Sequence, residues 1–339
     1  MITGKNYIGN DLSGIGNKFH KTINAKLNVE NSINFIDATS KEINQAVTLA
    51  HKAFQVYKNI SGKEKASFLN CISDEILALG DELIEIFILE SGFPEGRALG
   101  ERSRTVFQLQ AFAKMIQTDD WKNNIIEKSL PNRKPSPKPD IRKSYIPIGP
   151  IAVFTPSNFP LAYSSAGGDT SSALASGCSV VVKAHYMHSG TAELVSSAII
   201  KSVKKTGMPN GVFSNINGGI EVGQYLVKNL KIKGVGFTGS KSGGRSIYNI
   251  GSQREEPIPV FSEMGSINPV IISSKSIDSR YKEIANILSE SITLGAGQFC
   301  TNPGLIIVID NESTMNFIDN LINNVIKKGS QCMIHQNIK

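Results

Sequence analysis

The spacing of apolar residues predicts a run of helices in the first third of the chain. Between residues 39 and 116, apolar positions recur every three or four residues, as one face of an amphipathic helix requires. Thr39 with Glu42 has the pattern of a capping box, which marks the start of a helix. Periodicity and stop signals predict three further helices, one starting at Ser61, one over residues 81–90 and one over 95–116.

From residue 148 onward, short apolar runs alternate with helical segments. Strands are predicted over residues 151–155, 179–184, 212–216, 234–238, 259–261, 269–272 and 305–309, and helices over 166–176, 191–205, 221–230, 242–250, 281–294 and 315–328. Several strands are unbroken runs of valine and isoleucine, which suit burial on both faces of a parallel sheet. Repeated βα units of this length predict an α/β fold with a doubly wound parallel sheet.

Composition and charge exclude several classes of protein. Of 339 residues, 40% are hydrophobic and 19% charged, an ordinary globular balance that excludes wholesale disorder. No apolar run reaches the ~18 residues of a membrane helix, and the first residues lack the apolar core of a signal peptide. The net charge of +7 gathers partly in a proline-rich stretch over residues 119–144, which lacks the aromatics of a nucleic-acid site. That stretch is predicted to be a linker or an excursion in extended structure, and no nucleic-acid or membrane partner is expected.

The four cysteines have no CxxC spacing, which argues against a disulfide scaffold or zinc finger and favours a reducing, cytoplasmic setting. Cys71 and Cys178 fall on apolar positions of a helix and a strand, and Cys332 has no evident partner. Cys300 differs because two nearby glycines leave it uncrowded. A thiol in such a setting can be a nucleophile if its pKa is lowered or a base is close, although a free cysteine is more often an inert core residue.

Three polar residues stand at the ends of predicted strands. Asn158 lies in a turn stiffened by prolines, where its amide either holds an oxyanion or forms an ordinary Asx turn. Glu263 is either a carboxylate facing a cleft or a surface acid, and Lys183 either points at the ligand crevice of an α/β sheet or reaches solvent. His185 and His188 lack a nearby carboxylate or cysteine, so they are weak metal ligands and no metal is expected.

A glycine-rich turn, Gly239-Ser240-Lys-Ser-Gly243-Gly-Arg, follows one predicted strand and opens a helix. Exposed backbone N–H groups and the positive end of a helix suit a phosphate at this place, and an ordinary βα turn is the alternative. A literal G-x-G-x-x-G also ends at Gly239. Its first two glycines lie inside the strand, whereas the dinucleotide fingerprint needs them after it.

Together and in this order, the motifs resemble the aldehyde dehydrogenase superfamily along nearly the whole chain. The matching segments are Thr-Pro-Ser-Asn158-Phe-Pro, Val-Val-Val-Lys183-Ala-His, Gly-Phe-Thr-Gly239-Ser240-Lys-Ser-Gly243-Gly-Arg, Ser-Glu263-Met-Gly-Ser-Ile-Asn-Pro and Gly-Gln-Phe-Cys300-Thr-Asn-Pro. Within the superfamily, one bacterial branch is most similar in the segments Ser-Asn158-Phe-Pro-Leu-Ala, Ala-Gly-Gly-Asp-Thr, Val-Lys183-Ala-His and Gln-Phe-Cys300-Thr-Asn-Pro-Gly. That branch contains the α-ketoglutaric semialdehyde (2,5-dioxopentanoate) dehydrogenases and the NADP-linked fatty-aldehyde dehydrogenases.

The resemblance implies a role for each matching residue. Cys300 would attack the aldehyde as a thiolate, and the Asn158 amide with the Cys300 backbone N–H would hold the oxyanion. Glu263 would activate the water that hydrolyses the resulting thioester. The implied cofactor-binding residues are Thr155, Pro156, Ser157, Lys183, Ala184, His185, Gly239, Ser240, Gly243 and Met264.

The implied cofactor is NADP, with NAD left open. NAD-preferring members of the family commonly carry a carboxylate three residues after the lysine. Here that position is Tyr186, so no acid repels a ribose 2′-phosphate. Against NADP, Glu221 lies near the place where NADP-linked relatives use an arginine, and His185 or another cation would have to compensate.

The resemblance also implies a domain organisation. Residues 1–118 would be the N-terminal helical part of the cofactor domain, 119–147 an oligomerisation ribbon or linker, 148–262 the Rossmann-like core and 263–339 the first portion of the catalytic domain. Family members continue much further past the nucleophile, so the chain is expected to be C-terminally truncated and the ribbon to lack its partner strand. Homo-oligomerisation, expected of the full-length family, is in doubt for such a chain.

The expected function is NAD(P)-dependent oxidation of a small aldehyde to a carboxylic acid, with 2,5-dioxopentanoate giving 2-oxoglutarate as the first choice. The alternatives are a fatty or broad-specificity aldehyde dehydrogenase, an inactive cofactor-binding fragment, and a hydrolase or acyl-transfer enzyme that uses Cys300 without a cofactor. The last alternative leaves the glycine turn and Lys183 unexplained.

Overall fold

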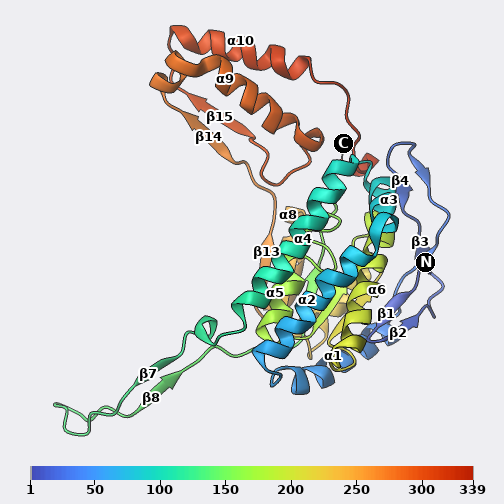
Figure 1. Ribbon diagram of the computed structural model, residues 1–339, viewed down its shortest axis with the longest axis vertical. Helices are drawn as coiled ribbons and strands as arrows, with labels where there is room; N and C mark the ends of the chain where they lie inside the picture. The colour runs from blue at the N-terminus through green and yellow to red at the C-terminus, as the bar shows by residue number, and fades with distance from the viewer. Residues whose placement is uncertain (1, 339) are drawn as a thin grey trace.

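A seven-stranded sheet forms the centre of the larger part of the molecule (Figure 1). The computed structural model describes residues 2–338. In spatial order the strands are β13-β12-β9-β10-β11-β1-β2, and the first five run parallel to one another. Their bounds are Val260–Glu263 (β13), Gly234–Thr238 (β12), Ile151–Phe154 (β9), Val180–Lys183 (β10), Phe213–Ile216 (β11), Asn6–Ile8 (β1) and Asp11–Ser13 (β2). The parallel core confirms the predicted α/β fold.

Helices cover both faces of this sheet, as a doubly wound fold requires (Figure 1). They are Ser40–Tyr57 (α1), Gly62–Ala78 (α2), Gly80–Ser91 (α3), Glu95–Met115 (α4), Gly168–Ser176 (α5), Ser189–Lys205 (α6), Ile220–Lys228 (α7) and Lys241–Ser252 (α8). Val153 of β9 packs in the apolar cluster that α2 to α6 share, whereas Ala152 and Phe154 pack with α1, α7 and α8. Both faces are therefore apolar, which explains the unbroken valine and isoleucine runs. Thr39 and Glu42 form the predicted capping box.

The first 36 residues contain short strands that the apolar spacing does not predict. β1 extends the central sheet by pairing antiparallel with β11, with Tyr7 opposite Asn215. The others are Phe19–His20 (β3), Ile23–Asn24 (β4), Val29–Glu30 (β5) and Phe35–Ile36 (β6). Strands of two or three residues are too short to show a two-residue periodicity. This segment also brings Asp37 close enough to Lys183 to act on the pKa of that ammonium.

Residues 119–147 leave the body of the molecule as a two-stranded ribbon (Figure 1, lower left). β7 (Ile125–Glu127) pairs antiparallel with β8 (Ile141–Lys143), and Leu130 bridges Lys138 nearer the tip. This pairing supports the expectation of extended structure over that of a plain linker. Within residues 2–338 each strand keeps one unpaired edge, to which another strand can add. A role of the ribbon in oligomerisation stays a prediction.

A smaller lobe contains β14 (Pro269–Ile272), α9 (Ser274–Thr293), β15 (Leu305–Val308) and α10 (Glu312–Ile326) (Figure 1, top). β14 and β15 are parallel, and Leu288 with Phe317 belongs to a separate apolar cluster. α9 begins earlier than predicted because the Ser273 side chain caps it. A 3-10 turn, Leu294–Gly297, leads from α9 into the loop that carries Cys300. Among the described residues, no helix is long and apolar enough to cross a membrane.

Candidate active site

Cys300 lies in the loop between α9 and β15, and one asparagine side chain holds this loop. Asn268 Nδ2 donates to the carbonyl oxygen of Cys300 at 2.6 Å and to that of Asn302 at 2.9 Å. Asn268 has a φ of 47°, a left-handed conformation that asparagine tolerates better than most residues. The Ser266 hydroxyl fixes its Oδ1 at 2.9 Å. Cys300 is half-buried, so it lies neither in the apolar core nor fully exposed to solvent.

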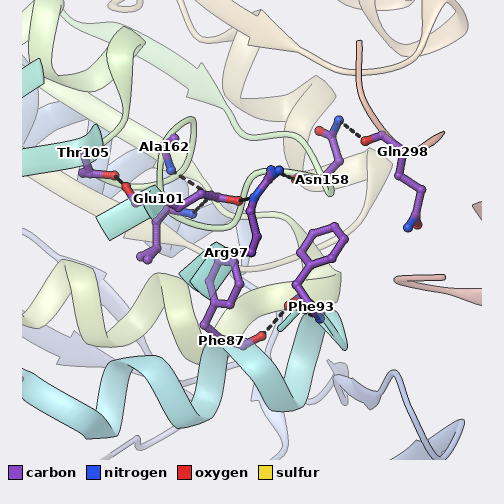
Figure 2. Close-up of polar contacts among 10 residues, drawn as sticks. Phe87, Phe93, Arg97, Glu101, Thr105, Asn158, Ala162 and Gln298 are labelled. Carbon is purple, nitrogen blue, oxygen red and sulfur yellow. Dashed lines mark hydrogen bonds and ion pairs between the residues drawn. The ribbon is translucent and has the colours of Figure 1, made fainter. Parts of the chain in front are cut away.

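Asn158 reaches the same loop from the sheet side of the molecule (Figure 2). It follows β9 in a turn that contains Pro156 and Pro160, and its side-chain Nδ2 donates to the carbonyl oxygen of Gln298 at 2.9 Å. Gln298 precedes Cys300 by two residues. The structure therefore brings the predicted oxyanion donor and the predicted nucleophile to one loop. Nδ2 carries two hydrogens, and the bond to Gln298 uses one of them.

Gln298 also fastens this loop to the last residues of the chain. Its Nε2 donates to the carbonyl oxygens of Gly295 at 2.9 Å and Cys332 at 3.2 Å, and its Oε1 accepts the Ile334 N–H at 2.9 Å. The Cys332 thiol in turn donates to the Ala25 carbonyl oxygen at 3.2 Å. The expectation that Cys332 has no partner is therefore wrong. Burial raises the pKa of its thiol, which keeps it protonated and unreactive.

An arginine and a glutamate on α4 hold the turn that carries Asn158, and sequence reasoning missed both (Figure 2). Arg97 Nε donates to Glu101 Oε1 at 2.7 Å, and Arg97 Nη2 donates to the Asn158 carbonyl oxygen at 3.3 Å. Glu101 Oε2 accepts the backbone N–H groups of Leu161 at 3.1 Å and Ala162 at 3.2 Å. Burial raises the pKa of Glu101, and the Arg97 guanidinium opposes that rise. The i,i+4 spacing was visible, but it is also the ordinary pattern of a surface ion pair.

Glu263 ends β13 with its side chain exposed. It lies opposite Thr238, and its carbonyl oxygen accepts the Gly239 N–H at 3.0 Å, so it borders the glycine-rich turn. Within residues 2–338 no hydrogen bond or ion pair holds the Glu263 carboxylate or joins it to Cys300. The structure therefore does not bring these two side chains into direct contact, and the role of Glu263 as a base stays a prediction.

The residues predicted to bind cofactor at the ends of β9 and β10 lie together. The His185 N–H donates to Thr155 Oγ1 at 2.8 Å, and His188 Nε2 lies 2.8 Å from the Pro156 carbonyl oxygen. Lys183 ends β10, and within the described residues its ammonium has no hydrogen bond or ion pair. Burial lowers the pKa of Lys183 to about 8. A cation held in this way at the carboxyl ends of parallel strands is available to an anionic ligand.

Two further predicted residues lie at the carboxyl ends of β9 and β10, and the expectation of a positive charge on His185 there is wrong. Ala184 is buried and its N–H donates to the Ile216 carbonyl oxygen at 2.9 Å, while Ser157 is half-buried beside Asn158. Burial, reinforced by the positive charge of Lys183, holds the pKa of His185 well below its usual value. His185 is therefore neutral near pH 7, and it is not the cation that would compensate Glu221.

The glycine-rich turn forms the start of α8. Ser240 caps this helix, and its Oγ accepts the Gly243 N–H at 3.2 Å. A Cβ atom at Gly239 would lie 2.8 Å from the Phe237 ring, closer than real Cβ contacts allow, and one at Gly243 would lie 3.0 Å from it, tighter than most real contacts. Glycine is thus needed for the helix start to approach that ring. The Met264 side chain lies against Gly244 of the same helix.

The other candidates do not form a site. Among the described residues, no group of three or more His, Cys, Asp or Glu side chains is arranged to hold a metal ion. Burial lowers the pKa of His188 to about 4, so its ring is neutral near pH 7. Cys178 is buried as predicted, whereas Cys71 is half-buried instead of fully in the core.

A cleft of about 620 Å³ adjoins the Cys300 loop, between the start of α4 and the end of α9. Its walls include Phe93, Arg97, Thr293 and Gly295. Cys300 is not part of its wall, so the cleft approaches the loop from the side of Gly295 and does not reach the thiol.

Comparison with known sequences gives close relatives over most of the chain. Residues 15–332 match the aldehyde dehydrogenase family. Two curated relatives are α-ketoglutaric semialdehyde dehydrogenase 2 of Azospirillum brasilense, 45% identical, and α-ketoglutaric semialdehyde dehydrogenase of Acinetobacter baylyi, 43% identical. Both alignments cover 302 residues, or 89% of this chain, but only 58% and 57% of the relatives. The chain thus spans less than three fifths of their length.

Solved structures show the same fold. An NAD-dependent benzaldehyde dehydrogenase from Corynebacterium glutamicum superposes with a TM-score of 0.82 at 22% identity, over 99% of this chain and 70% of that one. The aldehyde dehydrogenase KauB from Pseudomonas aeruginosa gives 0.81 at 20% identity, over 96% of this chain and 63% of that one. Identities this low establish the fold alone. The sequence match over residues 15–332, two relatives above 40% identity and the shared fold show that this chain belongs to the aldehyde dehydrogenase family.

Proposed function

We propose that this chain carries the nucleophile, oxyanion donor and cofactor-binding residues of an NAD(P)-dependent enzyme that oxidises α-ketoglutaric semialdehyde to 2-oxoglutarate. The observation that carries the proposal is the Asn158 side-chain amide, which reaches the Cys300 loop at the Gln298 carbonyl oxygen, 2.9 Å away. The substrate is taken from the two relatives at 45% and 43% identity. The proposal includes a reducing, cytoplasmic setting, because the nucleophile must stay a free thiol.

The proposed reaction begins at the Cys300 sulfur. The thiolate adds to the aldehyde carbon, a C–S bond forms, and the carbonyl oxygen becomes an oxyanion. The second Asn158 Nδ2 hydrogen and the Cys300 backbone N–H donate to this oxyanion, and one such donor is worth ~3 kcal/mol. A nicotinamide cofactor, when bound, would accept the hydride that leaves the same carbon. A thioester then remains on Cys300.

Hydrolysis of that thioester is the proposed work of Glu263. Its exposed carboxylate takes a proton from water, and the water oxygen attacks the thioester carbon. The C–S bond breaks, the carboxylic acid leaves, and the Cys300 thiolate is restored. A thiolate serves both steps because it is a good nucleophile and a good leaving group.

The residues at the carboxyl ends of the parallel strands fit a dinucleotide. The Lys183 ammonium has no partner among the described residues and lies where an α/β sheet binds ligands. Gly239 and Gly243 add no side chain at the start of α8, where backbone N–H groups can meet a pyrophosphate. We propose Lys183 as the contact to the adenosine ribose, and NADP over NAD because Tyr186 replaces the acid that would repel a 2′-phosphate.

The affinity for NADP is expected to weaken as pH rises through the pKa of Lys183. That pKa is lowered to about 8, so the ammonium is charged at pH 7 and mostly neutral at pH 9. The dissociation constant, measured by fluorescence titration, should rise about tenfold between these two values. Lys183→Met should bind weakly with a flat profile, and the exposed Lys231→Met should keep the wild-type profile. The assignment of Lys183 fails if Lys183→Met retains the full pH dependence.

The proposed activity is tested by absorbance at 340 nm with a panel of aldehydes. α-Ketoglutaric semialdehyde with NADP should give NADPH, with kcat/KM at least ~10-fold above that of a long-chain aldehyde, because each ~1.4 kcal/mol of extra transition-state binding is tenfold. A preference for the long-chain aldehyde would point to a fatty-aldehyde dehydrogenase. Cofactor binding without any NADPH formed would instead identify a cofactor-binding chain without this activity.

A further inference from the structure

The Arg97 side chain touches both parts of the candidate active site. We propose that Arg97 is a positioning residue, which holds Asn158 and the Cys300 loop in their relative places, and that Glu101 in turn holds Arg97. The inference rests on the proposed roles of Asn158 and Cys300. It gives α4, which carries Arg97 and Glu101, a part in the reaction although neither of these two side chains reacts with the substrate.

On the sheet side, Arg97 and Glu101 each form hydrogen bonds with the turn that carries Asn158 (Figure 2). Arg97 Nη2 donates to the Asn158 carbonyl oxygen at 3.3 Å. Glu101, bonded to Arg97 Nε at 2.7 Å, accepts the N–H groups of Leu161 and Ala162 through its other oxygen at 3.1 and 3.2 Å. Fixing the turn before and after its second proline fixes the direction in which the Asn158 amide points.

On the other side, the guanidinium lies against three aromatic rings. Its carbon is 4.3 Å from the centre of the Phe299 ring, 4.6 Å from that of Phe159 and 5.1 Å from that of Phe93. Phe299 is the residue before Cys300, and Phe159 is the residue after Asn158. The two rings also meet edge to face with their centres 5.5 Å apart. One planar cation therefore contacts the chain neighbour of each residue that the reaction needs.

This arrangement requires arginine rather than any cation. Guanidinium offers a rigid fork of donors in its plane and two flat faces for rings, whereas the lysine ammonium is a compact charge without faces. The Arg97 side chain is 19% exposed and that of Glu101 is 3% exposed, so neither is a freely moving surface group. Burial raises the pKa of Glu101, and the charge of Arg97 opposes this rise. A neutral residue at position 97 would therefore leave the buried Glu101 carboxylate without a counter-charge.

Arg97→Lys is therefore the test variant, because it keeps the charge beside Glu101 and loses the fork and the flat faces. Arg102→Lys is the matched control on the same helix, since the Arg102 guanidinium bonds the Gly80 carbonyl oxygen at 3.2 Å, away from Asn158. Thermal unfolding and NADP titration come first: both variants should unfold cooperatively above the assay temperature and bind NADP, with Arg102→Lys close to the wild type in both measurements.

Hydrogen exchange followed by mass spectrometry tests the positioning without any turnover. In Arg97→Lys, the amides of residues 157–162 and 296–302 should exchange about fivefold faster or more, because the contacts that restrain both segments are lost. Arg102→Lys should exchange as the wild type does. Unchanged exchange in both segments of Arg97→Lys overturns the proposal.

A double-mutant cycle tests whether Arg97 acts through Asn158. Asn158→Ala alone should lower kcat by ~10²–10³-fold, as the loss of an oxyanion donor does. In the Arg97→Lys background, where the donor is already displaced, the same change should cost less than about tenfold, because coupled residues are not additive. Equal costs in the two backgrounds would contradict the proposal. If the wild type forms no NADPH from any aldehyde, the proposed function fails, and the exchange result alone decides the positioning.

Discussion

Replacement of Cys300 with serine is expected to lower aldehyde-dependent NADPH formation by ~10⁴-fold or more, while NADP binding stays unchanged. A serine hydroxyl is not ionised near neutral pH and is a much weaker nucleophile than a thiolate, and the serine alkoxide is a worse leaving group than the cysteine thiolate. The measurement is the initial rate of absorbance change at 340 nm, with the dissociation constant for NADP measured on the same preparation.

The control for this variant is Cys71→Ser, which alters a half-buried thiol on α2 and should keep the wild-type rate within about twofold. Together the two variants separate the loss of one nucleophile from a general effect of removing a thiol. Wild-type turnover in Cys300→Ser would remove the nucleophile from the account, and equal loss in both variants would point to damage of the fold.

Glu263→Gln is expected to lower steady-state kcat by ~10²–10⁴-fold, because glutamine cannot take the proton from the hydrolytic water. The first turnover should survive, since formation of the thioester on Cys300 does not need this base. Rapid-mixing absorbance at 340 nm should therefore show a burst of about one NADPH per chain, followed by a slow phase.

Glu255→Gln is the matched control, an exposed glutamate in the segment that leads into β13, and it should show wild-type steady-state rates. A first turnover slowed as much as the steady state would mean that Glu263 acts before the thioester, on the thiol itself. Unchanged kcat would mean that another group activates the water.

The long elements could be predicted because their signals are repeated many times along the sequence. α1 and α2 have capping boxes and apolar faces of four or five turns, and β10 is a run of valines buried on both sides. The strands before residue 37 could not be predicted, because a pair such as Phe19–His20 is too short to show a period. Their positions depend on pairing with distant segments, as in the contact of Tyr7 with Asn215.

The candidate site was predictable where the residues that flank a polar side chain are unusual. An asparagine between prolines and a cysteine close to two glycines were both conspicuous, and the structure brings Asn158 to the Cys300 loop. Arg97 and Asn268 were missed because their residue types are common in ordinary roles, one in helix-surface ion pairs and the other in turns. Only their hydrogen bonds in the folded chain distinguish them from such residues: Arg97 to the Asn158 carbonyl oxygen, and Asn268 to the carbonyl oxygens of Cys300 and Asn302.

The correction at His185 has a simple physical cause. A histidine near a proposed phosphate site looks like a cation in the sequence, but burial and the neighbouring Lys183 hold its pKa well below the usual value. The charge at this edge therefore rests on Lys183, whose own pKa is lowered to about 8. Sequence spacing shows which residues are near one another, and burial decides which of them is charged.

The most direct test of the central claim is the mass of the Cys300 peptide after reaction. Glu263→Gln is mixed with α-ketoglutaric semialdehyde and NADP, quenched in acid within the burst phase, digested and analysed by mass spectrometry. The account predicts one 2-oxoglutaryl group on the peptide that contains Cys300, in an amount equal to the NADPH formed, and none when NADP is omitted. NADPH formation with the acyl group on another residue, or with an unmodified Cys300 peptide throughout the burst, would contradict it.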